Sequence, residues 1–241
     1  MPVRRAKLPS CFCFHFSIIS LSLLRLIGTP VYVDRTEYYL KEADMRKRNF
    51  SKMKIHEVMP LLGTRTILKW MLNAPPHSPS DILTGVLGRL QRFDTMRTEP
   101  AKLLLVDALL AETVFAYTLL KVWKGQALES ATLTGFADYL ITPDYAYMDA
   151  LLLCAAEAKK DDFDQGQAQC LAELVACREK NLAAGYDIDL FGFVSNGQTW
   201  GFYKLTKTND IYETSEYNVE SLLRLLGALD YICAECAKRV P

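Results

Sequence analysis

Histidine is scarce in this sequence: there are three among 241 residues, and none follows His77. A Ser-His-Asp or Cys-His hydrolase needs a histidine beside its nucleophile, and many zinc sites use histidine as a ligand. The patterns GxGxxG, GxxxxGK[ST] and GxSxG are also absent. These absences argue against histidine-dependent hydrolases and zinc sites, and leave the usual phosphate cradles and the nucleophile elbow without support.

Cysteine is also sparse, with seven residues spread along the chain. An odd, dispersed set does not suit a disulfide-stapled scaffold, so we expect a reducing compartment, the cytoplasm. A single C-x-x-C pair, Cys233 and Cys236, lies in a predicted C-terminal helix without a second pair to complete four zinc ligands. We expect both cysteines to be structural.

No apolar run has a comfortable length for a membrane span, so we expect no membrane association. The apolar stretch at residues 11–24 follows basic residues and resembles the apolar region of a signal peptide. That pattern leaves secretion or membrane tethering as one interpretation. The interpretation we favour is that residues 1–50 are a non-globular extension, or that the true start is Met45 or Met53.

The formal net charge is zero, but the charges are unevenly distributed. Residues 1–59 carry a balance of +6 and residues 60–241 a balance of −6. An acidic body is a poor general binder of duplex nucleic acid, because Lys and Arg contacts to phosphate dominate such affinity. Clustered acids can instead hold a hard metal ion that faces phosphate.

The periodicity predicts an α/β (α+β) fold in which helices flank a mixed central β-sheet. Residues 51–98 form a short helical lead-in, and residues 99–241 form the main domain. The segment Ser195-Asn196-Gly197, with its Asn-Gly pair, predicts a β-hairpin. The predicted helices cover residues 59–74, 81–90, 98–121, 165–180 and 222–237, and the clearest predicted strands cover residues 135–141, 150–156, 188–194 and 199–205.

An ionisable triplet follows the most apolar predicted strand. Glu157 and Lys159 are two residues apart, so both point to one face of a strand. Asp138 lies on the preceding strand, which can pair antiparallel with it. Two carboxylates and the carbonyl of Ala158 can hold Mg²⁺ or Mn²⁺. Lys159 can hold a water molecule or offset charge that develops on phosphate.

The spacing D-x(18)-E-x-K, formed by Asp138, Glu157 and Lys159, resembles the PD-(D/E)xK nuclease superfamily and its restriction-endonuclease-like fold. Residues 135–140, 157–174 and 194–205 are similar to a family of small uncharacterised proteins of that superfamily. These proteins resemble the nuclease part of type I restriction subunits. The resemblance covers residues 99–238.

The resemblance implies that Asp138 and Glu157 are metal ligands and that Lys159 is the catalytic lysine. Members of the superfamily often carry another acid on the first helix. Glu112 is the candidate for that position here, and Asp107 is its rival.

Some members also carry a glutamine on the helix after the lysine, which suggests Gln169, or Gln165, as a residue that positions water or substrate. A literal Pro143-Asp144 pair lies in the turn after the Asp138 strand, and we rank it below Asp138.

The implied activity is Mg²⁺- or Mn²⁺-dependent hydrolysis of phosphodiester bonds in DNA or RNA, with DNA the expected substrate. A homodimer is a possible assembly, because small nuclease sites often pair to cut both strands. The alternative is a catalytically inactive nuclease-fold protein that acts as a binding or regulatory module, which the acidic body favours.

Overall fold

The computed structural model describes residues 47–95, 97–158 and 162–241. Their strands form a mixed β-sheet. Within these residues nine strands follow the order β1-β4-β5-β6-β7-β8-β2, with β3 added on β4 and β9 on β7. This confirms the predicted mixed sheet flanked by helices. The strands are β1 (Arg48–Asn49), β2 (Ile67–Trp70), β3 (Leu120–Glu129), β4 (Leu133–Pro143), β5 (Cys154–Ala158), β6 (Leu190–Ser195), β7 (Thr199–Leu205), β8 (Ile211–Thr214) and β9 (Tyr217–Asn218).

The centre of the sheet combines antiparallel and parallel pairing. Strands β3, β4 and β5 pair antiparallel in sequence order, and β5 pairs parallel with β6. Strands β6, β7 and β8 then continue antiparallel. The predicted hairpin between β6 and β7 is confirmed, and Gly197 in its turn has a φ of 89°, which glycine adopts without a Cβ clash.

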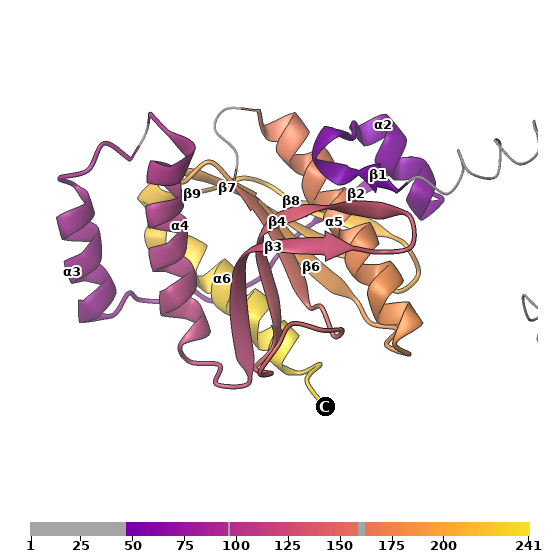
Figure 1. Cartoon of the computed structure of the whole chain (residues 1–241). Coiled ribbons are helices and arrows are strands. Elements are labelled where there is room, and N and C mark those ends of the chain that lie inside the picture. The colour runs from indigo at the N-terminus through magenta and orange to yellow at the C-terminus, as the bar shows by residue number, and fades with distance from the viewer. Residues whose placement is uncertain (1–46, 96, 159–161) are drawn as a thin grey trace, which may run out of the picture. The chain divides into compact units, whose positions relative to one another are not determined.

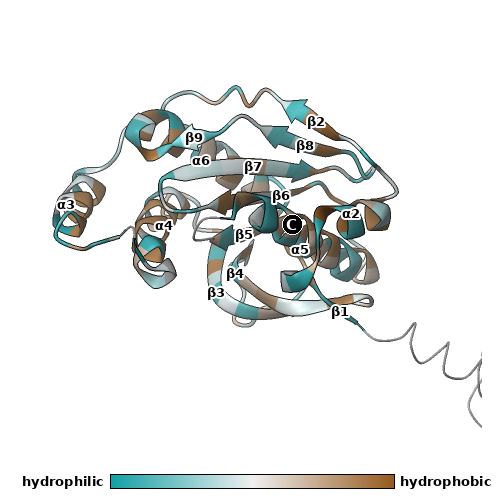
Figure 2. Cartoon of the chain, turned by 90° about the horizontal axis from the view of Figure 1, so that it is seen from above, coloured by the Kyte–Doolittle hydropathy of each residue, from teal (hydrophilic) through white to brown (hydrophobic). Residues whose placement is uncertain are grey.

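Helices cover both faces of this sheet. In Figure 1, α3 and α4 lie on one side, while α2 and α5 lie on the other. Figure 2 shows the strands from above, with β3 and β1 at one end and β8 and β2 at the other. The helices are α2 (Ile55–Val58), α3 (Asp81–Leu90), α4 (Glu99–Val114), α5 (Phe163–Ala183) and α6 (Leu222–Ala237), with 3-10 turns at η3 (Phe50–Lys52), η4 (Met59–Leu62) and η5 (Val219–Ser221).

Each face of the sheet carries its own apolar cluster. One joins α5 to the lead-in and to the face of β4 and β5 that carries Leu140 and Ala155. The other joins α4 and α6 to the opposite face, which carries Tyr139 and Ala156. Because adjacent residues of a strand point to opposite faces, this division also fixes the direction of the polar side chains on β4 and β5.

The lead-in belongs to the same compact unit as the main domain, since residues 46–241 form one unit. Phe50, the last residue of the segment predicted as an extension, is fully buried. It packs so closely on Gly135 of β4 that a Cβ there would lie 2.6 Å from the phenyl ring. Arg48 and Asn49, in the same segment, form β1 and pair parallel with β4. Residues 1–46, which include the apolar stretch, lie outside the described residues.

The helix predicted at residues 59–74 is wrong. Only the turn η4 is helical, and β2 follows at Ile67–Trp70, where it pairs parallel with β8. Leu61, Leu62, Ile67 and Leu68 imitate helical spacing, but the partner strand lies far along the sequence. Periodicity over one short window does not contain that pairing.

The helix predicted to end near residue 121 ends at Val114, because β3 begins at Leu120. Thr113, in the last turn of α4, donates its hydroxyl to the carbonyls of Leu109 and Leu110. Tyr117 also lies beyond the helix, where its hydroxyl donates to Asp230 over 2.8 Å. The apolar residues just after Val114 therefore belong to the connection between α4 and β3 and not to a further helical turn.

The strand that precedes the acidic triplet also begins later than predicted, at Cys154. Asn181 of α5 accounts for the difference. Its Oδ1 accepts from the amide of Leu152 over 2.8 Å, and its Nδ2 donates to the carbonyl of Leu152 over 2.7 Å. A buried side chain thus replaces a neighbouring strand at Leu152 and directs the chain into β5.

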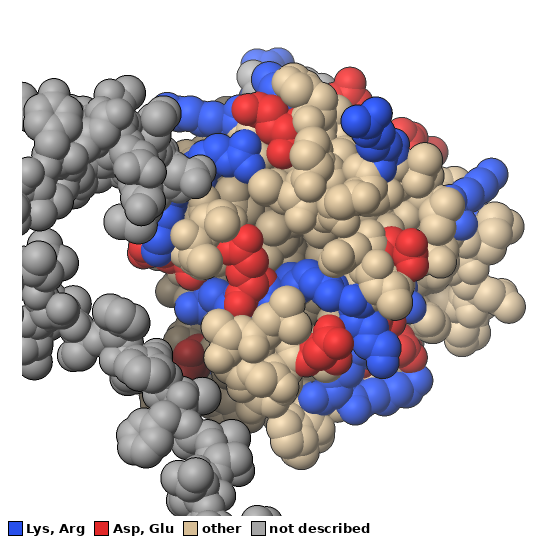
Figure 3. All heavy atoms as spheres, turned by 90° about the vertical axis from the view of Figure 1, so that its right-hand side faces the viewer, with Lys and Arg blue, Asp and Glu red and all other residues tan. Residues whose placement is uncertain are grey.

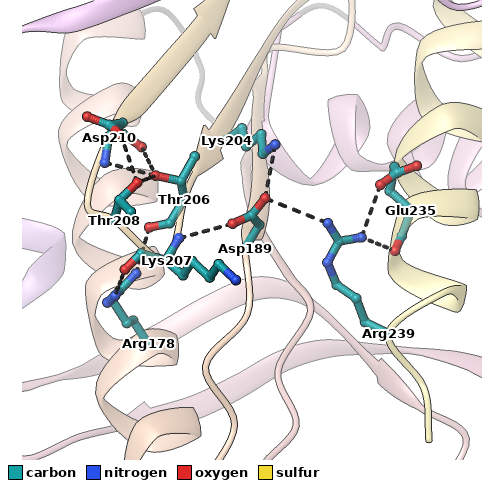
Figure 4. Close-up of polar contacts among 9 residues, drawn as sticks. All are labelled: Arg178, Asp189, Lys204, Thr206, Lys207, Thr208, Asp210, Glu235 and Arg239. Atoms are coloured by element: carbon teal, nitrogen blue, oxygen red, sulfur yellow. Dashed lines mark hydrogen bonds and ion pairs between the residues drawn. The ribbon is translucent and has the colours of Figure 1, made fainter.

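A polar network joins β6, β7 and α6 at one end of the sheet (Figure 4). Asp189, just before β6, accepts from the amide of Lys207 over 3.0 Å and pairs with the Lys204 ammonium at 3.0 Å. Arg239, after α6, lies 3.9 Å from Asp189 and bonds to Glu235. Arg178, Lys204 and Arg239 each have an acceptor in this network, which therefore serves as a structural connection.

Cys233 and Cys236 lie in α6, buried and unpaired. Burial raises the pKa of Cys233 to about 12, despite a hydrogen bond with Thr113 that lowers it. A thiol with this pKa stays protonated near neutral pH, which agrees with the expected structural role. Within the described residues, no helix combines the length and apolar character needed to cross a membrane.

Candidate active site

Asp138 and Glu157 lie on adjacent strands, as predicted. Strands β4 and β5 pair antiparallel, and their last paired residues, Tyr139 and Ala156, are the neighbours of Asp138 and Glu157 along the chain. The amide of Ala158 donates to Asp138 Oδ2 over 2.8 Å, so the aspartate carboxylate is fixed at the end of β5. Two acidic residues separated by most of a hairpin thus meet at one strand end.

Glu157 points to the face that α5 covers. It is 2% exposed, and its Oε2 accepts from Gln169 Nε2 over 2.6 Å. The same Nε2 donates to Glu173 Oε1 over 3.1 Å. Gln169 and Glu173 are 3% and 0% exposed, and they lie one helical turn apart on α5. Gln169, predicted from the sequence, therefore contacts Glu157 directly.

The prediction missed Glu173. Its signal in the sequence is a charged residue four positions after Gln169, within a helix whose neighbouring positions Cys170, Leu171 and Leu174 are apolar. A carboxyl on the apolar side of a helix is unusual, because burial of a charge needs a partner. That partner group, Gln169 with Glu157, comes from a strand and is visible only in the folded chain.

Burial in this site raises the pKa of Glu173 well above its usual range. The negative charge of Glu157 and a hydrogen bond with Glu157 raise that pKa further, whereas the Gln169 amide lowers it in part. Burial and a second acidic side chain thus both disfavour the charged form of Glu173.

Lys159, the predicted catalytic lysine, lies outside the described residues. Asp144, of the literal Pro-Asp pair, is exposed and lies 3.4 Å from the Lys121 ammonium. It follows the end of β4 rather than standing opposite Glu157. Asp138 is accordingly the aspartate that the fold brings to the glutamate strand.

Neither of the acids on α4 that the sequence offered, Glu112 and Asp107, is brought to Glu157. Glu112 accepts from the amide of Ser80 over 2.6 Å and from its hydroxyl over 2.8 Å, at the start of α3. Asp107 accepts from Lys124 over 2.6 Å and from the Tyr139 hydroxyl over 2.8 Å. Helix α4 packs on the Tyr139 face of the sheet, whereas Glu157 faces α5.

Gln165, the rival of Gln169, anchors the lead-in instead. Its Nε2 donates to the carbonyls of Ser51 and Met53, and its Oε1 accepts from the Lys54 ammonium over 2.8 Å. Both glutamines lie on α5, but only Gln169 contacts the strand that carries Glu157.

The donor atoms gathered here suit a hard divalent cation in type. Asp138, Glu157 and the Ala158 carbonyl offer oxygen only, and Mg²⁺ often takes one or two carboxylates and keeps several waters. Within residues 47–95, 97–158 and 162–241, no three His, Cys, Asp or Glu side chains are grouped as a metal site.

No model of a known protein family matches the chain, and a search of curated proteins finds no match.

Proposed function

We propose that this chain is a metal-dependent nuclease that hydrolyses phosphodiester bonds, with a restriction-endonuclease-like core. The observation that carries the proposal is the meeting of Asp138 and Glu157 at one strand end, fixed by the 2.8 Å bond from the Ala158 amide. The run from α4 through β3, β4 and β5 to α5 and β6 supports it. This run pairs the aspartate strand with the glutamate strand and covers the glutamate with the following helix.

In this proposal Asp138, Glu157 and the Ala158 carbonyl hold a Mg²⁺ or Mn²⁺ ion. When bound, the ion supplies charge stabilisation for the phosphate and lowers the pKa of a coordinated water. Asp138 takes a fixed direction from the Ala158 amide, and Glu157 takes one from Gln169. Lys159 orients the attacking water and offsets negative charge on the phosphate.

The proposed substrate is DNA in preference to RNA, and a homodimer is the proposed assembly for cutting both strands. Figure 3 shows Lys and Arg among the acids on the side that lies at the right of Figure 1. Such cations supply the phosphate contacts that any nucleic-acid affinity needs. The five unpaired cysteines in the described residues are compatible with work in a reducing compartment.

The test is a cleavage assay with the purified full chain, Mn²⁺ or Mg²⁺, and a panel of single- and double-stranded DNA and RNA. We expect metal-dependent cleavage that chelation by EDTA stops. Lys159→Ala should lower the rate by at least about 100-fold, because it removes a charge that acts on the transition state. Lys160→Ala is the matched control, a neighbouring lysine without a proposed role, and should retain the rate. Equal rates for the two variants would remove the proposed mechanism.

The second candidate is a catalytically inactive nuclease-fold module. The deep burial of Glu157 and its contact with Gln169 favour it, because both restrict access to the carboxylate. Such a module would cleave none of the nucleic acids in the panel. It would also bind Mn²⁺ weakly or not at all, and calorimetric titration would give the same result for the intact chain and for Asp138→Asn.

A further inference from the structure

The amide group of Gln169 bridges two carboxyl groups. Its nitrogen lies 2.6 Å from Glu157 Oε2 and 3.1 Å from Glu173 Oε1, so both of its hydrogens have an acceptor. All three side chains are almost wholly buried, which excludes bulk water as a competing partner. Gln169 and Glu173 come from α5, whereas Glu157 comes from β5, so the bridge also joins the helix to the strand.

The bridge determines which way the Gln169 amide faces. Its Oε1 is buried without a hydrogen-bonding partner among the described residues, and so is Glu173 Oε2. A buried acceptor without a partner is unfavourable, and this effect alone would favour the rotated amide, in which Oε1 and Nε2 exchange places. The opposite orientation would set Oε1 against the oxygens of two carboxyl groups. The second carboxyl group therefore strengthens the preference for the orientation in which the nitrogen faces Glu157.

We propose that Glu173 is a positioning residue of the Asp138–Glu157 site, which acts through Gln169 to fix the direction of the Glu157 carboxylate. Its consequence for metal binding rests on the function proposed above. Groups that orient a ligand typically contribute 10- to 100-fold to metal affinity or activity. Glu173 is not itself a ligand in this proposal, because it touches Glu157 and Gln169 rather than the reacting atoms.

Two substitutions separate positioning from packing. Glu173→Gln keeps an oxygen that accepts from Gln169 and nearly the same shape. Glu173→Leu fills similar volume but offers no acceptor, and apolar replacement of a buried charged group is often tolerated by the fold. The control is Glu179→Gln on the same helix, whose carboxylate accepts from the amide and hydroxyl of Thr132, away from Glu157.

The first measurement needs no metal: crystal structures of the metal-free wild type, Glu173→Gln and Glu173→Leu. We expect the contact from Gln169 Nε2 to Glu157 Oε2 in the first two structures. In Glu173→Leu, the amide should be rotated or the contact broken. An unchanged contact in Glu173→Leu would overturn the positioning role whether or not the protein binds metal.

The second measurement is calorimetric titration of the same proteins and Glu179→Gln with Mn²⁺. We expect Glu173→Leu to weaken Mn²⁺ binding by about 10- to 100-fold. Glu173→Gln and Glu179→Gln should stay within about threefold of the wild type, since both keep the bridge. Equal loss in Glu173→Gln and Glu173→Leu would overturn the inference. Absence of Mn²⁺ binding by the wild type would instead overturn the proposed function, and the crystal structures would still decide the positioning role.

Discussion

Replacement of Asn181 by alanine tests how the chain is directed into the site. Asn181 is 1% exposed, and its amide group satisfies both the N–H and the C=O of Leu152, two residues before β5. Alanine leaves both backbone groups buried without a partner. Each such group costs about 1–3 kcal/mol, so we expect a loss of about 2–6 kcal/mol in the free energy of unfolding.

Urea denaturation followed by circular dichroism measures this loss. With an m-value of about 2–3 kcal/mol per molar urea, the midpoint should fall by about 0.7–3 M while the m-value stays constant. Asn73→Ala is the matched control, because Asn73 is exposed in the segment between β2 and α3. That substitution should change the free energy of unfolding by less than about 0.5 kcal/mol.

A loss below about 1 kcal/mol in Asn181→Ala would refute the reasoning, since it would mean that Leu152 finds other partners. Asn181→Asp separates the two bonds. It keeps an acceptor for the Leu152 amide but sets a carboxylate oxygen against the Leu152 carbonyl. We expect it to destabilise the protein as well, and to recover stability as the pH falls and the carboxyl is protonated.

Two further substitutions test the packing and the polar network. Gly227→Ala should destabilise the fold strongly, since a Cβ there would lie 2.1 Å from the carbonyl oxygen of Pro75. The control is Gly88→Ala, in open space on α3, which should be neutral or stabilising by up to about 1 kcal/mol. Equal thermal midpoints for the two variants would contradict this reasoning. Partial burial raises the pKa of Asp189, but the hydrogen bond from the Lys207 amide and the Lys204 ammonium outweigh it and hold the pKa below the usual range. The stability that Asp189 contributes is therefore present above about pH 4 and is lost as the pH falls through the lowered pKa. The difference in free energy of unfolding between wild type and Asp189→Asn should accordingly shrink on acidification. A constant difference from pH 7 to pH 2 would argue against the pairing of Asp189 with Lys204.

The pairing of Asp138 with Glu157 could be predicted because it depends on local rules. An apolar strand, a turn and a second strand fix an antiparallel neighbour, and the alternation of side chains fixes the face. Gln169 came instead from the resemblance to the superfamily, which left Gln165 open as its rival, and only the packing of α5 on β5 distinguishes the two.

The first-helix acids could not be assigned in the same way. Glu112 and Asp107 lie on α4, and the sequence does not state which face of the sheet α4 covers. Their partners, Ser80 and Tyr139, become visible only when the helix is packed. Glu173 was missed for a related reason, because a single acid among apolar residues has no partner until β5 is brought to α5.

Strand β2 and the start of β5 depend on contacts between distant parts of the chain. The parallel partner of Ile67–Trp70 lies in β8, and the group that holds Leu152 is the side chain of Asn181. Local periodicity contains neither contact. The sequence therefore mispredicts these two segments, because their hydrogen bonds are made with residues far away along the chain.

The rate of nucleic-acid cleavage as a function of Mn²⁺ concentration, measured for the wild type, Asp138→Asn and Asp144→Asn, tests the central claim most directly. The two variants carry the same substitution, at Asp138 within β4 and at Asp144 just after it, but only Asp138 accepts from the amide of Ala158, next to Glu157. We predict Mn²⁺-dependent cleavage by the wild type, a loss of at least about 100-fold in Asp138→Asn, and a wild-type rate in Asp144→Asn. A wild type without Mn²⁺-dependent cleavage, or a loss confined to Asp144→Asn, would contradict the account.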